Sequence, residues 1–220
     1  MASNIRAAVF DLGGVLIDWN PRYLYRKLFD GDEAGMEAFL TEVCTPAWNE
    51  EQDGGRPFAD AVALLVAQHP THAALIEAYD ARWEEMLAGP IAGSVEILAA
   101  LKAQRMPLYA LTNWSAEKFP IARRRFDFLQ WFDGIVVSGE IRLKKPDPEI
   151  FRHLLDGFGL TAGETLFIDD SEPNVAAAQA AGMTALRFRS PQALRRDLTA
   201  LGLLDGPERP LEAQGIPTNP

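Results

Sequence analysis

The sequence predicts an α/β protein with a parallel sheet as its core and a bundle of helices inserted after the first strand. Short runs of branched and aromatic residues, typical of buried strands, alternate with helical stretches over residues 90–204. Between the first such run and residue 90, apolar residues recur at helical spacing and no convincing strand is found. Strands separated by helices of this length form a parallel sheet with right-handed crossovers.

The first predicted strand is the apolar run at residues 5–10, which is followed directly by Asp11. Gly13 and Gly14 come next, and glycine allows the backbone to turn sharply and to approach a ligand closely. Open α/β sheets bind their ligands beyond the carboxyl ends of the strands. We therefore expect the Asp11 carboxylate to face a binding crevice.

A helical insert is predicted over residues 18–89. Asn20 and Pro21 begin its first helix in the preferred way, with asparagine as the N-cap and proline at the first helical position. Further helices are expected at about residues 32–43, 57–69 and 71–88. A polar, glycine-containing stretch at residues 48–56 separates two of them, and it is expected to be either a loop over the site or an exposed turn with a packed Trp48.

The alternation in the second half of the chain predicts the remaining core elements. Strands are expected at residues 108–111, 135–137, 165–168 and 184–188. Helices are expected near residues 93–104, 115–126, 148–159 and 172–181. Residues 1–17 and 90–204 would then form one core, followed at residues 205–220 by a proline- and glycine-rich tail that packs as irregular chain or stays mobile.

The composition limits the partners and the location of the protein. A net charge of −10 argues against nucleic acid or an anionic membrane as a partner, because both favour a basic surface. Cys44 is the only cysteine, so no intrachain disulfide forms and a reducing compartment is natural. The sequence shows no signal peptide and no apolar run near twenty residues, which predicts a cytoplasmic protein, monomeric or homodimeric.

Three predicted strands end in polar residues that would meet at one rim of the sheet. Asp11 follows the first strand, Thr112 and Asn113 follow the second, and Asp169 and Asp170 follow a late one. Three carboxylates gathered there could not all stay ionised without a cation. Mg²⁺ binds one or two carboxylates together with water and substrate oxygens, and it would also neutralise a phosphoryl group.

A lysine close to this rim would supply a second positive charge. Lys144 and Lys145 precede Pro146, and the prolines of this segment stiffen the backbone and could hold one lysine in place. An ammonium and the Thr112 hydroxyl are both suitable donors to phosphate oxygens. With the negative charges screened in this way, Asp11 could attack phosphorus and form an aspartyl-phosphate that water later hydrolyses.

These segments resemble the motifs of the haloacid dehalogenase (HAD) superfamily of hydrolases, helical-cap subfamily. In chain order they are Phe10-Asp11-Leu12-Gly13-Gly14-Val15-Leu16, Leu111-Thr112-Asn113, Lys145-Pro146-Asp147-Pro148-Glu149-Ile150-Phe151, and Phe167-Ile168-Asp169-Asp170 with Asn174. They span residues 5 to about 190 in the order typical of the family. The resemblance implies a Rossmann-like core and a helical cap inserted after the first motif.

The resemblance also implies a role for each residue of these motifs. Asp11 would be the nucleophile and Lys145 the charge stabiliser, preferred to Lys144 because the family's lysine directly precedes the Pro-x-Pro segment. Thr112 would bind phosphate, with Asn113 beside it in the catalytic set. The implied metal ligands are the carboxylates of Asp11, Asp169 and Asp170 and the backbone carbonyl of Gly13. Asn174 would position the acid pair.

Gly13 departs from the pattern of most phosphatases of this superfamily, which carry a second aspartate at that position. The aspartate protonates the leaving group and later activates water, and such proton transfer contributes about 10²–10⁴-fold to the rate. The loss of this proton transfer would slow the hydrolysis of sugar 1-phosphates and acyl phosphates less, because their leaving groups depart more easily. Asp18 or Asp53 would replace the missing acid if either side chain reached the site.

Three further residues are expected at the substrate site, namely Gly14, Trp19 and Trp114. Gly14 belongs to the turn after the nucleophile, and Trp19 lies at the entry to the helical insert. Trp114 follows Asn113 and could stack on a sugar. The alternative for Trp114 is packing against the insert.

The predicted function is that of a Mg²⁺-dependent phosphatase acting on a small phosphorylated metabolite, such as a sugar phosphate. One alternative is a metal-independent 2-haloacid dehalogenase, since a departing halide needs no proton. Those dehalogenases are rich in Ser and Asn where this chain has Asp169 and Asp170. The acid pair therefore favours the phosphatase, and a small halogenated acid is the less favoured substrate. A binding protein that lost its acid at Gly13 is a further alternative. A receiver domain is disfavoured, because its acid pair comes first and its chain is about half as long.

Overall fold

Strand β1 (Ala7–Phe10) lies inside a five-stranded parallel sheet in the computed structural model, which describes residues 4–205. The strands follow the order β5-β4-β1-β6-β7. The other four strands are β4 (Leu108–Thr112), β5 (Gly134–Val137), β6 (Thr165–Asp169) and β7 (Thr184–Arg187). All four strand pairs are parallel, which confirms the predicted α/β fold.

The register of the sheet brings the carboxyl ends of its central strands together. Phe10 lies opposite Ala110 of β4 and Ile168 of β6. Asp11 follows β1 at once, and its N–H donates a hydrogen bond to the Ile168 carbonyl across 2.8 Å. The residues that end β1, β4 and β6 are therefore neighbours at one rim of the sheet.

Helices cover both faces of the sheet. They are α6 (Ala92–Ala103), α7 (Phe119–Arg125), α9 (Pro148–Phe158), α10 (Glu172–Ala180) and α11 (Pro191–Ala200). Ala8 and Phe10 pack in the apolar layer that includes residues of α6, α7 and α11, whereas Val9 packs in the opposite layer with α9 and α10. Because successive side chains of a strand point to opposite faces, burial on both sides explains the continuous apolar sequence of β1.

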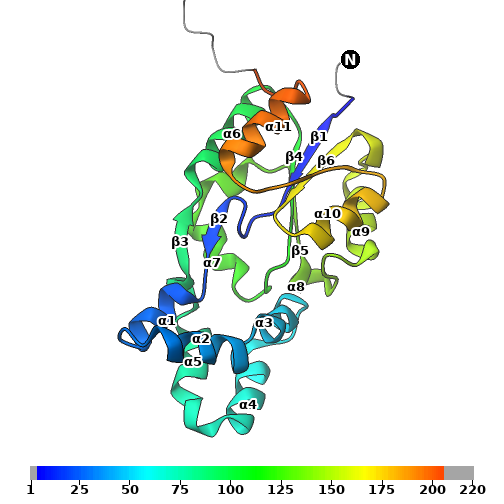
Figure 1. Ribbon diagram of the computed structural model, residues 1–220. Coiled ribbons are helices and arrows are strands. Elements are labelled where there is room, and N and C mark those ends of the chain that lie inside the picture. The colour runs from blue at the N-terminus through cyan, green and yellow to red at the C-terminus, as the bar shows by residue number, and fades with distance from the viewer. Residues whose placement is uncertain (1–3, 206–220) are drawn as a thin grey trace, which may run out of the picture.

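The helical insert lies beyond the carboxyl ends of the parallel strands (Figure 1). Its helices are α1 (Arg22–Leu28), α2 (Glu33–Glu42), α3 (Pro46–Asp53), α4 (Phe58–Gln68) and α5 (Ala73–Ala81). Aromatic side chains hold them together: the rings of Tyr25 and Phe39 lie 5.0 Å apart, as do those of Trp48 and Tyr79. The Tyr25 hydroxyl also donates to the Leu75 carbonyl at 2.9 Å.

Two short strands at the base of the insert contradict the expectation that no strand occurs there. Strands β2 (Ile17–Trp19) and β3 (Leu87–Pro90) form an antiparallel ribbon. The helix predicted over residues 71–88 consequently ends early, and a 3-10 turn (Trp83–Met86) leads into β3. A strand of three residues, as β2 is, and a strand that contains glycine and proline, as β3 does, give almost no propensity signal, so only their pairing reveals them. The predicted domain boundaries at this ribbon stay predictions.

Helix α3 replaces the loop that was expected at residues 48–56. The Thr45 side chain caps it by accepting a hydrogen bond from the Trp48 N–H at 3.0 Å, and Pro46 occupies the first turn. Thr45-Pro46 is a two-residue helix start within a polar stretch that ends in Gly54-Gly55, so the sequence signal for this helix is weak. Asp53 ends this helix instead of lying in a loop.

The remaining elements complete the core. They are α8 (Ser138–Ile141) and the 3-10 turns Pro70–His72, Asp127–Trp131 and Ala162–Glu164. Helix α11 was not predicted, although Ser190 caps it by accepting from the Ala193 N–H at 3.2 Å. The predicted tail lies outside the described residues from 206 onward. Within residues 4–205, every helix is too short or too polar to pass through a bilayer.

Helix α8 packs directly on the loop that follows β4. A Cβ added to Gly139 would lie 2.5 Å from the Ala116 nitrogen and 2.8 Å from the Trp114 carbonyl oxygen. The neighbouring Ser138 hydroxyl accepts from the Trp114 N–H at 2.9 Å and donates to the Asp53 carbonyl at 2.5 Å. The backbone after β4 is thus fixed between α8 and the end of α3.

Gly139→Ala is expected to lower the free energy of unfolding by about 1–3 kcal/mol, because the added methyl group would press on backbone atoms rather than on a flexible side chain. Gly157→Ala is the matched control. Gly157 lies in α9 with nothing within 4 Å of an added Cβ, so alanine should be neutral or gain about 0.5–1 kcal/mol. Urea unfolding followed by circular dichroism measures both variants, and equal stabilities would contradict the close packing of α8.

Candidate active site

Three carboxylates converge at the carboxyl ends of β1 and β6. Asp11 follows β1, Asp169 ends β6, and Asp170 is the next residue. One oxygen of each lies within 4.8 Å of the others. Asp169 is fully buried, Asp11 is 8% exposed, and Asp170 is open to solvent. Adjacent parallel strands therefore bring together the acids that the sequence placed at one rim.

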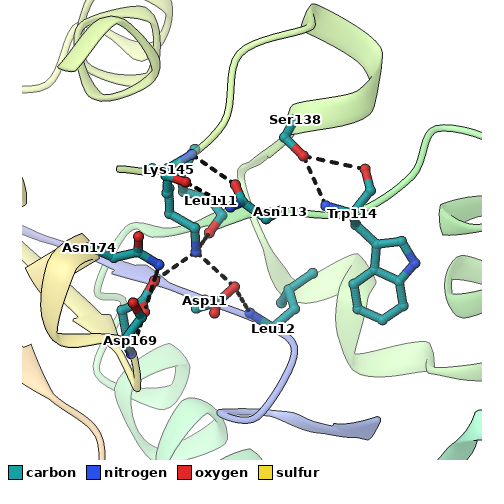
Figure 2. A network of polar contacts seen from close by, with 10 residues as sticks. Asp11, Leu12, Leu111, Asn113, Trp114, Ser138, Lys145, Asp169 and Asn174 are labelled. Atoms are coloured by element: carbon teal, nitrogen blue, oxygen red, sulfur yellow. Dashed lines mark hydrogen bonds and ion pairs between the residues drawn. The ribbon is translucent and has the colours of Figure 1, made fainter. Parts of the chain in front are cut away.

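The Lys145 ammonium lies between two of these carboxylates (Figure 2). Its Nζ is 2.9 Å from Asp11 Oδ1 and 2.7 Å from Asp169 Oδ2, and it donates to the Leu111 carbonyl at 2.8 Å. Lys144 instead faces Glu51 across 3.8 Å at the surface. Of the two neighbouring lysines, Lys145 is the one that reaches the acids, as expected from its position before Pro146.

Asn113 holds the backbone of Lys145 from both sides (Figure 2). Its Oδ1 accepts from the Lys145 N–H and its Nδ2 donates to the Lys145 carbonyl, each at 2.9 Å. The two bonds join the end of β4 to the segment before α9, which are far apart in the sequence. Asn113 thereby acts on the site by positioning the lysine.

Charges and burial oppose each other at this cluster. The pKa of Asp11 is raised to about 7, mainly by burial. The Lys145 ammonium lowers this pKa, whereas the charges of Asp169 and Asp170 raise it. Burial alone would lower the pKa of Lys145, but the neighbouring Asp11 and Asp169 carboxylates outweigh it and raise the pKa, so the ammonium stays charged. One ammonium cannot balance three carboxylates. The cluster therefore attracts a further cation.

Asn174 fixes the orientation of Asp169. Its Nδ2 donates to both carboxylate oxygens, at 3.0 and 3.1 Å, and the Ser171 N–H donates to Oδ1 at 2.8 Å. Asn174 lies in the first turns of α10 and is 8% exposed. The structure thus places Asn174 against the acid pair, where the sequence expected it.

Gly14 allows Asp170 to approach the turn after Asp11. Its φ of +75° belongs to the left-handed region, which favours glycine, and an added Cβ would lie 2.6 Å from Asp170 Oδ2. Gly13, by contrast, has nothing within 4 Å of an added Cβ. The absence of a side chain at Gly14 thus makes room for Asp170, and the predicted role of Gly14 in binding substrate stays a prediction.

A cavity of about 690 Å³ opens between this rim and the helical insert. The rim contributes Asn113, Lys145, Pro146, Asp170, Ser171, Pro173 and Asn174. The insert contributes Trp19, Asn20, Pro21, Arg22, Leu40, Thr41, Cys44, Pro46, Asn49, Glu50, Asp53 and Tyr79. The cavity combines charged groups on one side with aromatic and aliphatic groups on the other.

A smaller cavity of about 80 Å³ adjoins the turn at Gly13. Its lining residues are Gly13, Trp19, Asn49, Asp53, Trp83, Asn113, Trp114 and Ser115. Trp19 therefore lines both cavities. Trp114 lines the smaller one and packs on Trp83 of the insert, with ring centres 5.7 Å apart, whereas its stacking on a sugar stays a prediction.

Sequence reasoning missed Asn49, Tyr79 and Trp83 as cavity-lining residues. Asn49 lies in a stretch that the sequence predicts as a loop or an exposed turn, and Tyr79 lies in a predicted helix without a motif that marks a site. Their contact is polar: the Tyr79 hydroxyl donates to Asn49 Oδ1 at 3.1 Å. No residue pattern within a single helix could have shown this contact between two helices.

The residues at the rim fit a hard divalent cation and a phosphoryl group. Carboxylate oxygens are the ligands that Mg²⁺ prefers, and the surplus negative charge favours its binding. The Thr112 hydroxyl is buried and has no hydrogen-bond partner among residues 4–205. A buried hydroxyl without a partner is costly, and a phosphate oxygen would satisfy it.

Comparison with known proteins identifies the family. A family model for haloacid dehalogenase-like hydrolases matches residues 5–182. The chain belongs to this family. A sesquiterpene phosphatase from Aspergillus oryzae is 31% identical to this HAD-like hydrolase over 201 residues, which cover 91% of this chain and 98% of that protein. The hydrolase class and the family expected from the motifs are therefore confirmed.

Two further relatives bear on the site. A phosphorylated carbohydrates phosphatase from Thermotoga maritima is 25% identical over 183 residues, 81% of this chain and 82% of that protein. A HAD family enzyme from Bacteroides thetaiotaomicron, solved in complex with magnesium and inorganic phosphate, is 25% identical with a TM-score of 0.63. That likeness covers 84% of this chain and 95% of the other.

Lys145→Met is expected to lower the free energy of unfolding by about 3–5 kcal/mol at neutral pH, because it leaves two carboxylates buried without their positive partner. The loss should shrink as the pH falls. Without the ammonium, the pKa of Asp11 would lie above the present value of about 7 and well above its ordinary value of 3.8, so protonation at low pH favours the folded state.

Lys144→Met is the matched control for this variant. Its ammonium lies 3.8 Å from an exposed glutamate, so its loss should change the stability by less than about 0.5 kcal/mol. Thermal or urea unfolding of both variants at two pH values measures the difference. Similar losses for the two lysines would contradict the buried ion pairs of Lys145.

Proposed function

We propose that this HAD-like hydrolase is a Mg²⁺-dependent phosphatase that acts on a small phosphorylated metabolite through an aspartyl-phosphate on Asp11. The observation that carries the proposal is the convergence of three carboxylate oxygens within 4.8 Å beside the buried ammonium of Lys145. The phosphatase relatives from Aspergillus oryzae and Thermotoga maritima support the same reaction.

The carboxylates of Asp11, Asp169 and Asp170 and the Gly13 carbonyl would hold the metal ion. When bound, Mg²⁺ supplies positive charge that neutralises the phosphoryl oxygens and the carboxylates. The Thr112 hydroxyl would donate to a phosphoryl oxygen, and the charge of the Lys145 ammonium, whose three N–H groups already face Asp11, Asp169 and the Leu111 carbonyl, would stabilise the phosphoryl group electrostatically. Asn113 keeps the lysine in place through its two backbone hydrogen bonds.

Asp11 is the nucleophile in this proposal. Its carboxylate oxygen forms a bond to phosphorus while the bond from phosphorus to the leaving oxygen breaks. Water then attacks the aspartyl-phosphate, releases inorganic phosphate and restores the carboxylate. Lys145 favours the reactive ionised form of Asp11, because its charge opposes the effect of burial on the Asp11 pKa.

Helices α1 to α5 act as a cap in this proposal. They supply one side of the cavity of about 690 Å³ and would exclude water while the phosphoryl group transfers. Trp19, Leu40 and Tyr79 on that side suit an apolar carbon skeleton or the face of a sugar ring. A sugar phosphate and an isoprenoid phosphate are therefore the substrates to compare first.

A metal-independent 2-haloacid dehalogenase is the runner-up, because Asp11 could equally displace a halide from carbon. Asp170 argues against it. Its carboxylate adds negative charge beside Asp169 and Asp11, which would repel a carboxylic acid substrate unless a cation is present. A cytoplasmic location and a monomeric or homodimeric state stay predictions from the sequence.

Phosphate release from p-nitrophenyl phosphate tests the proposal directly. Activity is expected with Mg²⁺ and should be abolished by EDTA. Asp11→Asn should lower kcat on the order of 10⁴-fold or more, since the nucleophile is lost.

Asp170→Asn should raise the Mg²⁺ concentration for half-maximal activity by at least about tenfold. The exposed Asp60→Asn serves as a control without effect. Halide release from 2-haloacids in EDTA would instead favour the dehalogenase.

Thr112→Val separates phosphate binding from folding. The variant keeps the side-chain shape and removes a hydroxyl that is buried without a partner among the described residues, so stability should be unchanged or higher. A lost hydrogen bond to a charged phosphate should weaken competitive inhibition by inorganic phosphate about 10–100-fold. Inhibition constants and melting temperatures measure the two effects, and unchanged inhibition would exclude Thr112 from phosphate binding.

A further inference from the structure

The proposed reaction needs a proton for its leaving group, and the core does not provide an obvious donor. An alcohol departs from phosphorus easily only if its oxygen is protonated as the bond breaks. Asp11 serves as nucleophile, and Asp169 is bound by Lys145 and Asn174. Gly13 has no side chain, although an added Cβ there would meet nothing within 4 Å. The space beside the nucleophile is thus open on the side of the helical insert.

We infer that the Asp53 carboxyl group, at the end of α3, protonates the leaving oxygen and later takes a proton from the attacking water. The inference rests on the proposed phosphatase function. Asp53 lines both cavities, the small one together with Gly13 and the large one together with Lys145 and Asp170. It therefore faces the site from the helical insert.

The position of Asp53 is fixed by hydrogen bonds to its backbone and its side chain. The Ser138 hydroxyl donates to the Asp53 carbonyl at 2.5 Å and accepts from the Trp114 N–H at 2.9 Å (Figure 2 shows the Ser138–Trp114 contact). Asn49 Nδ2 donates to Asp53 Oδ2 at 3.0 Å, and the Tyr79 hydroxyl donates to Asn49. A carboxyl group held in this way is preorganised for proton transfer to a bound substrate.

The surroundings of Asp53 favour the protonated form near neutral pH. Burial raises the pKa of Asp53 to about 7, opposed by the Lys144 charge and a backbone hydrogen bond from Ser115. The Glu50 and Asp11 carboxylates raise it further. The C-terminal end of a helix also disfavours a negative charge. A carboxyl group that titrates near the working pH can serve as acid and then as base.

The proton balance closes over the two steps. In the first, the bond between Asp11 and phosphorus forms, the bond to the leaving oxygen breaks, and the Asp53 proton moves to that oxygen, which departs as an alcohol. In the second, the Asp53 carboxylate takes a proton from water as the water oxygen bonds to phosphorus. The bond between phosphorus and Asp11 breaks, and both carboxyl groups return to their starting states.

Asp18 was the other candidate acid, and the structure places it elsewhere. Its carboxylate accepts a hydrogen bond from the Tyr23 hydroxyl at 2.8 Å in the ribbon at the base of the insert. Among the described residues, Asp18 does not belong to the lining of either cavity. Asp18→Asn is therefore a matched control for Asp53→Asn.

The test compares kcat/KM of Asp53→Asn for two substrates with different leaving groups. With glycerol 2-phosphate, an alkyl ester that needs protonation, kcat/KM should fall about 10²–10³-fold. With p-nitrophenyl phosphate, whose leaving group departs unprotonated, kcat/KM should change less than about fivefold, which also shows that the variant is folded. Its kcat should fall and a burst of p-nitrophenol should appear, because hydrolysis of the aspartyl-phosphate lacks its base.

A second variant restores an acid by another route. Adding Gly13→Asp to the Asp53→Asn variant should raise its kcat/KM for glycerol 2-phosphate at least about tenfold. The new carboxyl group would project into the open space beside the nucleophile. Asp18→Asn should match the wild type with both esters. Equal losses of kcat/KM for both esters, or none, in Asp53→Asn would overturn this inference and leave the phosphatase function intact. A wild type without phosphatase activity would overturn both.

Discussion

The buried ammonium of Lys145, shared between Asp11 and Asp169, is the interaction on which the rest of the site depends. Burying charges is costly, and the cost is offset only where the geometry is good and the remaining hydrogen bonds are made. Here the Leu111 carbonyl and the two bonds from Asn113 supply that support. The parallel sheet makes the arrangement possible, because β1 and β6 are neighbours and end at the same level.

The residues of the site that could be predicted are those that directly follow a single predicted strand. Asp11, Thr112, Asp169 and Asp170 each follow a short apolar run, and a parallel sheet then brings their side chains to one rim. The insert was predicted less well. Its stem ribbon is held by pairing between residues about seventy positions apart, and α3 starts at a two-residue signal within a polar stretch. The acid at residue 53 was consequently named from the sequence without a reason to prefer it to Asp18.

The site retains features that oppose folding. Three carboxylates share one ammonium, and the Thr112 hydroxyl is buried without a partner among residues 4–205. A sequence selected for stability alone would remove either feature at little loss of packing. Both would be compensated by a divalent cation and a phosphoryl group, so the unfavourable terms of the free protein are those that ligand binding would relieve.

Hydrogen bonds and one peptide bond connect the insert to the rim that holds Lys145. They run from the Asp53 carbonyl through the Ser138 hydroxyl to the Trp114 backbone, whose neighbour Asn113 holds Lys145. The close packing of Gly139 on the same loop leaves little room for α3 and the rim to shift independently. The proposed acid Asp53 and the proposed phosphate-site residues are thus held in fixed relative positions, although they come from different elements. Trp19 and Leu40 take no part in these hydrogen bonds, so changes there would alter the choice of substrate without disturbing this arrangement, whereas Tyr79 also holds Asn49 and through it the Asp53 side chain.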